Sequence, residues 1–295
     1  MRRRFATLDV FTDRSFTGNP LAVVLDPGGL DAATMQAVAR EFNHPETVFV
    51  FAPDDPAHRA RLRIFTPARE LPFAGHPTVG TAVLLALRDG GGAGREFVLE
   101  EPIGPVRCVL ESGAGARGTA RFAVPQLPAE VGPAPDAATI AAGLALSPQE
   151  IGFDGWRPSR WTAGNPFTFV PAGGLAALAR CRPDGDKFEA AFGEAGAAFV
   201  FCGETSAPGR QFHARMFAPG MGIREDPATG SAAAAFAGVI AARFSDGSHA
   251  VAIEQGYEMG RPSLIRLAIV VAAGKLVSAA IGGDAVIVTE GTIEA

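Results

Sequence analysis

Apolar and polar positions recur in the same order in the two halves of the chain. A turn-forming Gly-Asn-Pro triplet precedes an apolar run in each half. A further apolar run ends at Pro67 in the first half and at Pro219 in the second. Beyond these prolines, Pro77–Arg88 and Pro227–Arg243 are apolar nearly all round when set on a helix. A helix without a polar face is buried, so the pattern predicts short strands around one buried helix in each half.

Three pairs of motifs keep this order at offsets of 146, 152 and 150 residues. They pair Gly18-Asn19-Pro20 with Gly164-Asn165-Pro166 (164 − 18), Arg63–Pro67 with Arg215–Pro219 (215 − 63), and His76–Ala82 with Asp226–Ala232 (226 − 76). A repeat this long indicates two copies of a domain and not a solenoid. We therefore expect two similar domains, 1–128 and 129–295, joined near the proline-rich stretch Val124–Pro135, with a last strand that is free to pack on the first half.

The expected fold class is α+β. The chain has 295 residues, which is too long for one ordinary core and suits two domains of roughly 150 residues. We expect each half to be a curled, mostly antiparallel, barrel-like sheet around a central helix. Internal duplication further predicts pseudo-two-fold related halves whose helix starts point into one cleft.

Composition and charge exclude several classes of protein. Hydrophobic residues make up 47% of the chain and charged residues 19%, which is a globular composition. A net charge of −5, with no basic run beyond Arg2-Arg3-Arg4, argues against a nucleic-acid partner. No stretch is long and apolar enough to span a membrane. The three cysteines are scattered without metal-ligand spacing, which predicts reduced thiols, a cytoplasmic location and no metal.

Common cofactor and hydrolase motifs are also absent. The stretch Gly75–Thr81 resembles a phosphate loop but lacks the lysine that such a loop requires. There is no G-x-G-x-x-G after a strand and no G-x-S-x-G. We therefore expect no cofactor.

The starts of the two buried helices are the predicted ligand sites. Free N–H groups and the positive end of the helix dipole favour an anion there. Small residues would let a ligand approach the backbone, and they stand at Gly75, Gly80, Gly230 and Ser231. A small metabolite that carries a carboxylate is therefore the expected ligand.

Two residues that precede the helix prolines have different expected roles. Asp226 precedes Pro227 and is a good N-cap, so capping alone could explain it. His76 precedes Pro77, and histidine is not a preferred cap. A helix N-terminus disfavours the charged imidazole, so we expect a neutral His76 that can both donate and accept a hydrogen bond.

Glu46 is the candidate general acid/base. It stands at the mouth of the apolar strand Val48–Phe51, and burial would raise its pKa toward neutrality. The alternative is a solvated glutamate at the end of a loop.

With these residues identified, the chain resembles the phenazine-biosynthesis isomerase (PhzF-like) family, which shares the two-domain fold of diaminopimelate epimerase. The matching segments are L-D-V-F-T-D-R-S-F-T-G-N-P-L-A-V-V-L, P-E-T-V-F-V, R-I-F-T-P-A-R-E-L-P-F-A-G-H-P-T-V-G-T-A, T-A-G-N-P, E-D-P-A-T-G-S-A-A and E-Q-G-Y-E-M-G-R-P-S. They extend from residue 8 to residue 263, so the resemblance covers essentially the whole chain.

The resemblance implies that Glu46 moves a proton between carbons of the ligand. It also implies that His76, Asp226 and Ser231 line the cleft, with Gly75 and Gly230 beside them. The best-understood member of the family isomerises dihydro-3-hydroxyanthranilate. Epimerases of this fold use a thiol at each helix start, but no cysteine of this chain falls there, which favours a single-carboxylate proton shift.

Two other functions stay open on the sequence. One is a non-catalytic metabolite-binding protein on the same scaffold, although a binder has no need of Glu46. The other is a hydrolase or lyase that acts on an acidic substrate. The resemblance also suggests a homodimer.

Overall fold

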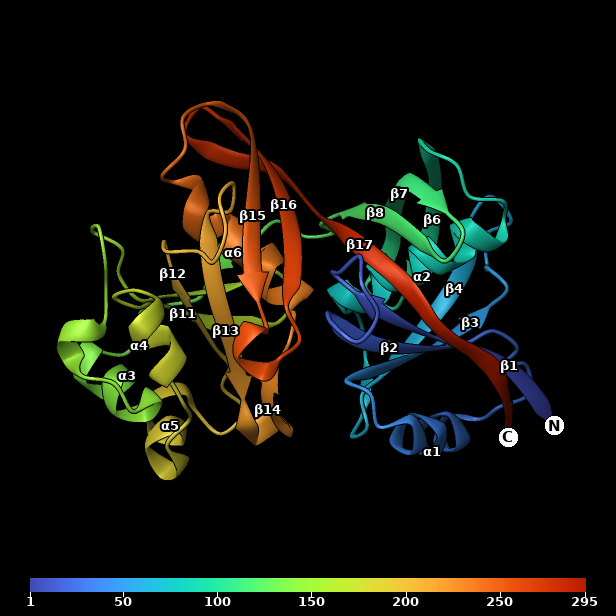
Figure 1. The fold of residues 1–295 in the computed structure, drawn as a ribbon, viewed down its shortest axis with the longest axis horizontal. Helices are drawn as coiled ribbons and strands as arrows, with labels where there is room; N and C mark the ends of the chain where they lie inside the picture. Colours follow the sequence, from blue (N-terminus) through green and yellow to red (C-terminus); the bar gives the residue numbers. More distant parts are fainter. The chain divides into compact units, whose positions relative to one another are not determined.

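The computed structural model describes all residues from Met1 to Ala295. They form two compact units, Met1–Pro125 with Ala280–Ala295 (unit 1) and Gln126–Ala279 (unit 2). Figure 1 shows the elements of both units.

Unit 1 is a closed ring of strands. The members are β1 (Arg2–Val10), β2 (Asn19–Val24), β3 (Glu46–Phe51), β4 (Ala60–Phe65), β6 (Arg95–Glu101), β7 (Gly104–Ala114), β8 (Arg117–Ala123) and β17 (Lys275–Glu294). Each strand pairs with the next in this order, and β17 returns to β1. All the pairs are antiparallel except β2–β3 and β4–β6. A short strand, β5 (Glu70–Leu71), forms a hairpin with β4.

Helix α2 (Gly75–Arg88) is the core of this barrel. It packs against β1, β2, β3, β6, β7 and β8, and every one of its residues up to Ala86 is buried. Its apolar sequence explains this position, since a helix without a polar face is stable only when it is surrounded. A second helix, α1 (Ala32–Phe42), lies outside the barrel, and its Met35 and Ala39 pack on Phe49 of β3.

Unit 2 repeats the pairing scheme of unit 1. Its strands are β9 (Ala129–Glu130), β10 (Ser159–Thr162), β11 (Pro166–Pro171), β12 (Ala198–Cys202), β13 (Phe212–Ala218), β14 (Ile223–Asp226), β15 (Gly247–Gln255) and β16 (Ser263–Ala272). The order β10-β11-β12-β13-β15-β16, with β14 as a hairpin on β13, matches β1-β2-β3-β4-β6-β7 with β5 on β4. The parallel pairs also correspond, because β11–β12 and β13–β15 take the places of β2–β3 and β4–β6.

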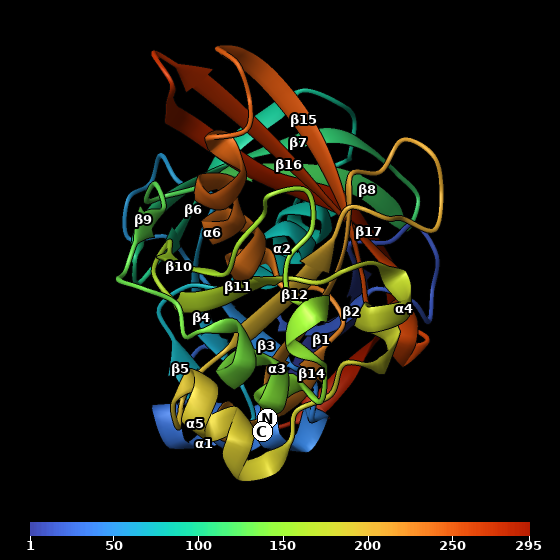
Figure 2. The ribbon, with the colours of Figure 1, turned by 90° about the vertical axis from the view of Figure 1, so that its left-hand side faces the viewer.

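The central helix of unit 2 is α6 (Gly230–Ala241), which packs against β9, β10, β11 and β16. Phe236 of α6 stacks on Phe169 and contacts Phe199 and Phe201, so aromatic rings fill this core. The shorter helices α3 (Ala137–Leu144), α4 (Leu175–Arg180) and α5 (Gly185–Phe192) form a separate group, which Figure 2 shows apart from α6. The predicted α+β architecture, with a curled sheet around a central helix in each half, is confirmed.

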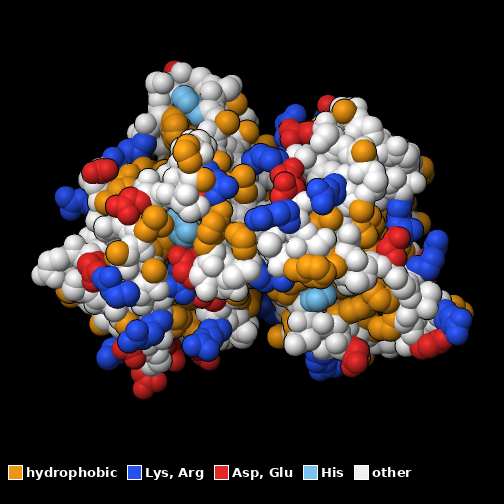
Figure 3. All heavy atoms as spheres, viewed as in Figure 1, with side chains coloured by type: hydrophobic (Ala, Val, Ile, Leu, Met, Phe, Trp, Pro, Cys, Tyr) orange, Lys and Arg blue, Asp and Glu red, His pale blue; other side chains and the backbone are white.

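The helices and the surface add two observations. No helix combines the length and the apolarity needed to cross a bilayer. On the face shown in Figure 3, basic and acidic side chains are interspersed over both units.

Candidate active site

Three predicted site residues come together in unit 1. Glu46 is the first residue of β3, and Gly75 and His76 are the first two residues of α2. Glu46 Oε2 lies 3.3 Å from His76 Nδ1, and the exposed fractions of the two side chains are 13% and 4%. The carboxylate therefore stands at the edge of the barrel core, in contact with the start of the central helix.

His76 is neutral at physiological pH. Burial lowers its pKa to about 3, although its hydrogen bond to the backbone of Pro20 opposes this shift. Pro20 belongs to the Gly-Asn-Pro motif, so this motif holds the imidazole from the neighbouring strand β2. The buried Nε2 atom has no hydrogen-bond partner. Because the ring is uncharged, its approach to Glu46 is not an ion pair, and Glu46 keeps its role as the candidate base.

The other three predicted residues lie together in unit 2. Asp226 ends β14, and Gly230 and Ser231 begin α6. The side chain of Asp226 is almost fully buried, and its Oδ2 accepts a hydrogen bond of 2.6 Å from Thr229 Oγ1. The N–H groups of Gly230 and Ser231 lie in the first turn, where no acceptor exists within the helix.

The predicted helix starts were wrong by two or three residues. Helix α2 begins at Gly75 and not at Pro77, since a proline is tolerated anywhere in a first turn where the N–H is unpaired. Helix α6 begins at Gly230 and not at Pro227, because Asp226–Thr229 form a turn closed by their two side chains. The N-cap of α6 is Thr229, so the capping role considered for Asp226 is also wrong.

The corrected helix starts change the alignment of the repeat. Residues 70–76 read E-L-P-F-A-G-H and residues 225–231 read E-D-P-A-T-G-S, at an offset of 155 (225 − 70). His76 therefore corresponds to Ser231 and not to Asp226, and both are second residues of a central helix. Asp226 corresponds to Leu71, so the acidic residue is a feature of unit 2 alone.

A glutamine that no sequence motif marked as a site residue holds the Asp226 turn in place. Gln255, at the end of β15, is fully buried. Its Nε2 donates to Asp226 O at 2.8 Å and to Thr229 Oγ1 at 3.0 Å, and its Oε1 accepts from Thr229 N at 3.1 Å. The next residue, Gly256, has φ +77° and lies so close to Pro227 that a Cβ would be 2.6 Å from the Pro227 carbonyl oxygen. The E-Q-G motif is therefore the support of this turn.

One glycine expected to admit a ligand has a packing role instead. A Cβ at Gly80 would lie 2.6 Å from Leu21 Cδ2 and 2.7 Å from Val10 Cγ2. Gly80 therefore allows α2 to approach β1 and β2 closely, and the expectation of ligand access at this residue was wrong.

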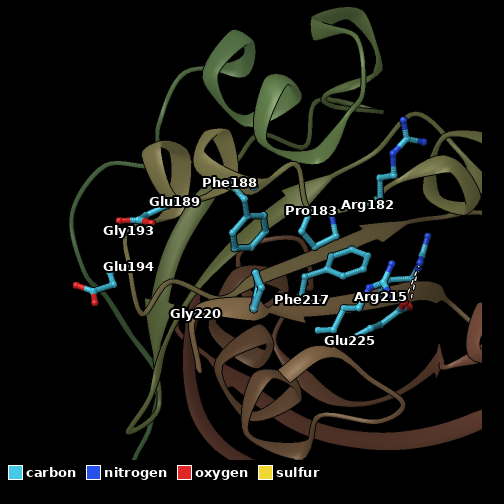
Figure 4. A pocket seen from close by; sticks show the side chains of 13 residues that line it. Arg182, Pro183, Phe188, Glu189, Gly193, Glu194, Arg215, Phe217, Gly220 and Glu225 are labelled. Atoms are coloured by element: carbon cyan, nitrogen blue, oxygen red, sulfur yellow. Dashed lines mark hydrogen bonds and ion pairs between the residues drawn. The ribbon is translucent and has the colours of Figure 1, made fainter. Parts of the chain in front are cut away.

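Each unit also contains a cavity away from these residues. The cavity of unit 2, about 380 Å³, lies between α5 and the β13–β14 hairpin. Figure 4 shows Phe188, Pro183 and Phe217 around it, with Arg215 bound to Glu225 on one wall. One cavity of unit 1, about 490 Å³, is lined in part by Arg63, Glu70 and Glu101. None of the predicted site residues lines either cavity.

The three cysteines are buried in the two cores. Burial raises the pKa of Cys108, raises that of Cys181 to about 12, and raises that of Cys202 to about 11. None of them lies in the first turn of α2 or α6. A mechanism with a thiol at each helix start has no residue to carry it in this chain.

We expect activity to survive both thiol alkylation and chelators. A buried thiol with a raised pKa is almost entirely protonated at pH 7.5 and reacts slowly. No group of three or more His, Cys, Asp or Glu side chains is placed to hold a metal ion. The check is turnover after native incubation with iodoacetamide or with EDTA. Rapid inactivation that a ligand prevents, or loss of activity that added metal restores, would contradict this expectation.

The two duplicated units, each a sheet curled around a central helix, define a protein of the diaminopimelate epimerase-like fold. The chain is similar to a solved structure of a Bacillus anthracis phenazine biosynthesis protein of the PhzF family. The match covers 100% of both chains, with a TM-score of 0.87 and 25% sequence identity.

Residues 8–291 match the model of the Phenazine biosynthesis-like protein family, and the chain belongs to this family. It is 50% identical to an uncharacterized isomerase of Mesorhizobium japonicum, over 99% of this chain and 98% of that one. It is 34% identical to the trans-2,3-dihydro-3-hydroxyanthranilate isomerase of Pseudomonas chlororaphis, over 98% of both chains. The chain is therefore an isomerase of the PhzF-like family.

Proposed function

We propose that this isomerase shifts a proton between two carbons of a small carboxylate-bearing metabolite, with Glu46 as the only acid/base. The observation that carries the proposal is the contact of Glu46 Oε2 with the neutral, buried His76 at the start of α2. A carboxylate at the edge of an apolar core, beside a helix N-terminus that can bind a ligand anion, is placed to act as a general acid/base on that ligand.

In the proposed reaction, Glu46 removes a proton from one carbon, and the electron pair of that C–H bond moves into the conjugated system of the ligand. The same carboxyl group then delivers a proton to a second carbon, so substrate and product have equal mass. With a pKa of about 3, His76 holds no transferable second proton at pH 7, and its role is to orient the ligand and Glu46. The N–H groups at the helix start would bind the ligand carboxylate.

The substrate is proposed by class. The Pseudomonas chlororaphis relative is named for trans-2,3-dihydro-3-hydroxyanthranilate, a cyclic amino acid with a hydroxyl group. We propose a substrate of this type, with a carboxylate for a helix start and polar groups for His76, Asp226 and Ser231. That Asp226, Gly230 and Ser231 bind the same ligand molecule as Glu46 stays a prediction.

Deuterium incorporation tests the proposal. We expect turnover in heavy water to place up to one deuterium on carbon of the product per turnover, since Glu46 exchanges its proton with solvent between the two transfers. Less label results if the same proton returns first. The measurement is mass spectrometry of trans-2,3-dihydro-3-hydroxyanthranilate, and then of cell extract, after incubation with the protein. A product that differs in mass from its substrate in ordinary water would replace the isomerase reaction with hydrolysis or elimination.

The non-catalytic alternative has a separate test. A metabolite-binding protein would retain a ligand in native mass spectrometry, and would release it unchanged and without deuterium. An isomerase converts that ligand into an isomer with a different retention time.

A further inference from the structure

Each unit contains its own copy of an arginine–glutamate ion pair that the proposed reaction does not use. Arg63 of β4 donates to Glu70 of β5 through Nε at 2.7 Å and through an Nη at 2.6 Å. Arg215 of β13 binds Glu225 of β14 in the same way, at 2.8 Å and 2.9 Å. Both are two-point contacts between a planar guanidinium and a carboxylate, which fix direction as well as distance.

The pair occupies equivalent positions in the two copies of the repeat. Each arginine stacks on the phenylalanine two residues further on, with 5.2 Å from Arg63 to the Phe65 ring centre and 4.9 Å from Arg215 to the Phe217 ring centre. Each glutamate stands five residues before the first glycine of its central helix, as the offset of 155 residues shows. The strand register agrees, since Ile64 pairs with Leu71 as Met216 pairs with Asp226.

The segment that links each glutamate to its helix is short and stiff. Only residues 71–74 or 226–229 separate them, and each segment contains a proline with a fixed φ angle. The position of Glu70 therefore constrains the positions of Gly75 and His76. Glu225 is the residue immediately before Asp226 in the sequence. A displacement of either glutamate would be passed on to the start of the helix.

We propose that Arg63–Glu70 and Arg215–Glu225 are positioning pairs that set the placement of the α2 and α6 starts for the ligand. This inference rests on the proposed function for its effect on turnover, but its structural part does not. In unit 1 the side chains of Arg63 and Glu70 are 25% and 34% exposed, so the pair is partly accessible to solvent. In unit 2, Arg215 also donates to the carbonyls of Leu178, Ala179 and Cys181 at the end of α4, which ties that start to a second element.

The test compares Glu70→Ala with Asp89→Ala. Asp89 follows the other end of α2 and accepts from Arg59 through both oxygens, at 2.7 Å and 2.8 Å, and these side chains are 24% and 35% exposed. Each variant thus removes a two-point ion pair of similar exposure from one end of the helix. Asp89→Ala also removes a contact of 3.4 Å between Asp89 Oδ2 and Arg95 Nη2, so it is the more disruptive of the two changes. A purely structural role of the ion pairs predicts the same effect on kcat for both variants.

For Glu70→Ala we expect faster amide hydrogen exchange in residues 71–78, and a kcat lowered roughly 10- to 100-fold with KM changed much less. For Asp89→Ala we expect neither change. The double variant Arg63→Glu with Glu70→Arg restores the pair and should recover part of kcat. In unit 2, Glu225→Gln should raise exchange in residues 226–231, and it leaves the contacts of Arg215 with α4 in place.

Three results would overturn the inference. The first is unchanged exchange at 71–78 in Glu70→Ala, the second is an equal loss of kcat in Asp89→Ala, and the third is faster exchange in Glu70→Ala without a change in kcat. If the unmodified protein has no isomerase activity on any tested acid, the proposed function fails, but hydrogen exchange still decides whether the pairs hold the helix starts. If exchange responds and kcat does not, the pairs order the loops without setting the reaction, and the positioning role is refuted.

Discussion

Replacement of Glu46 by glutamine should abolish turnover while the protein stays folded and still binds its ligand. The amide keeps the size of the carboxyl group and can still contact His76 Nδ1, which lies 3.3 Å from Oε2. It cannot accept and return a proton, and loss of a general acid/base costs roughly 10²–10⁴-fold in rate. The measurement is kcat on the substrate identified in heavy water, together with ligand affinity by calorimetry.

The control for this variant is Glu41→Gln. Glu41 is an exposed residue of α1 in the same unit, so the same chemical change occurs away from the barrel mouth. We expect wild-type kcat from Glu41→Gln and unchanged melting temperatures for both variants. Normal turnover by Glu46→Gln would remove Glu46 from the mechanism and leave only a binding site at the start of α2.

The duplication was accessible from sequence because its signals are local. A Gly-Asn-Pro turn before an apolar run identified β2 and β11, and a run that ends near a proline identified β4 and β13. The all-apolar stretches identified the two central helices, although their starts were misplaced. The error came from proline, which is common at the first position of a helix but also fits later in the first turn and in a preceding turn.

Outer helices and long strands were harder to predict. Helix α1 was missed although Asp31 caps it by accepting from Thr34 N, a local signal that the sequence contains. Strand β15 was missed because its first four residues are mostly exposed and its last three are all buried, so no single period describes it.

Residues that act through distant contacts were not predictable from one sequence. Gln255 supports Asp226 and Thr229 from 29 and 26 positions away, and only the folded strand order brings them together. The Arg63–Glu70 pair lies within a hairpin, but only its recurrence in unit 2 as Arg215–Glu225 indicates a role beyond that hairpin. The motif offsets of 146, 152 and 150 residues did not bring Glu70 and Glu225 into correspondence. Glu101 belongs to the same class, because its partner Thr78 lies on the central helix.

Glu101 should carry a proton in the folded protein at neutral pH. It is the last residue of β6 and is 5% exposed, and burial raises its pKa to about 8. Thr78 Oγ1 lies 2.7 Å from both Ala74 O and Glu101 Oε1. One hydroxyl proton can serve only one of these oxygens, so a protonated Glu101 satisfies both contacts.

This proton makes the stability of the fold depend on pH. The unfolded chain releases it near pH 4.5, whereas the folded chain keeps it until about pH 8. The contribution of Glu101 is therefore fully present below pH 4.5, and it falls by about 1.4 kcal/mol per pH unit as the pH rises toward 8. His76 has the opposite shift, from 6.5 to about 3, so its contribution is lost only as the pH falls below 6.5. Between pH 6.5 and 8, Glu101 is the one of these two groups that changes stability.

We expect Glu101→Gln to abolish the loss of folding stability that Glu101 causes as the pH rises. Glutamine keeps the shape and hydrogen bonds of the protonated acid but does not titrate, so the variant should gain stability relative to the unmodified protein by about 2 kcal/mol between pH 6.5 and pH 8. The measurement is the free energy of unfolding by urea for both proteins at several pH values. The difference between the two proteins at each pH cancels every titration that they share. Glu96→Gln, an exposed change on the same strand, should show no such pH-dependent difference. If the difference between Glu101→Gln and the unmodified protein is constant across this range, Glu101 is ionised in the fold, and Thr78 then has to bind a buried carboxylate.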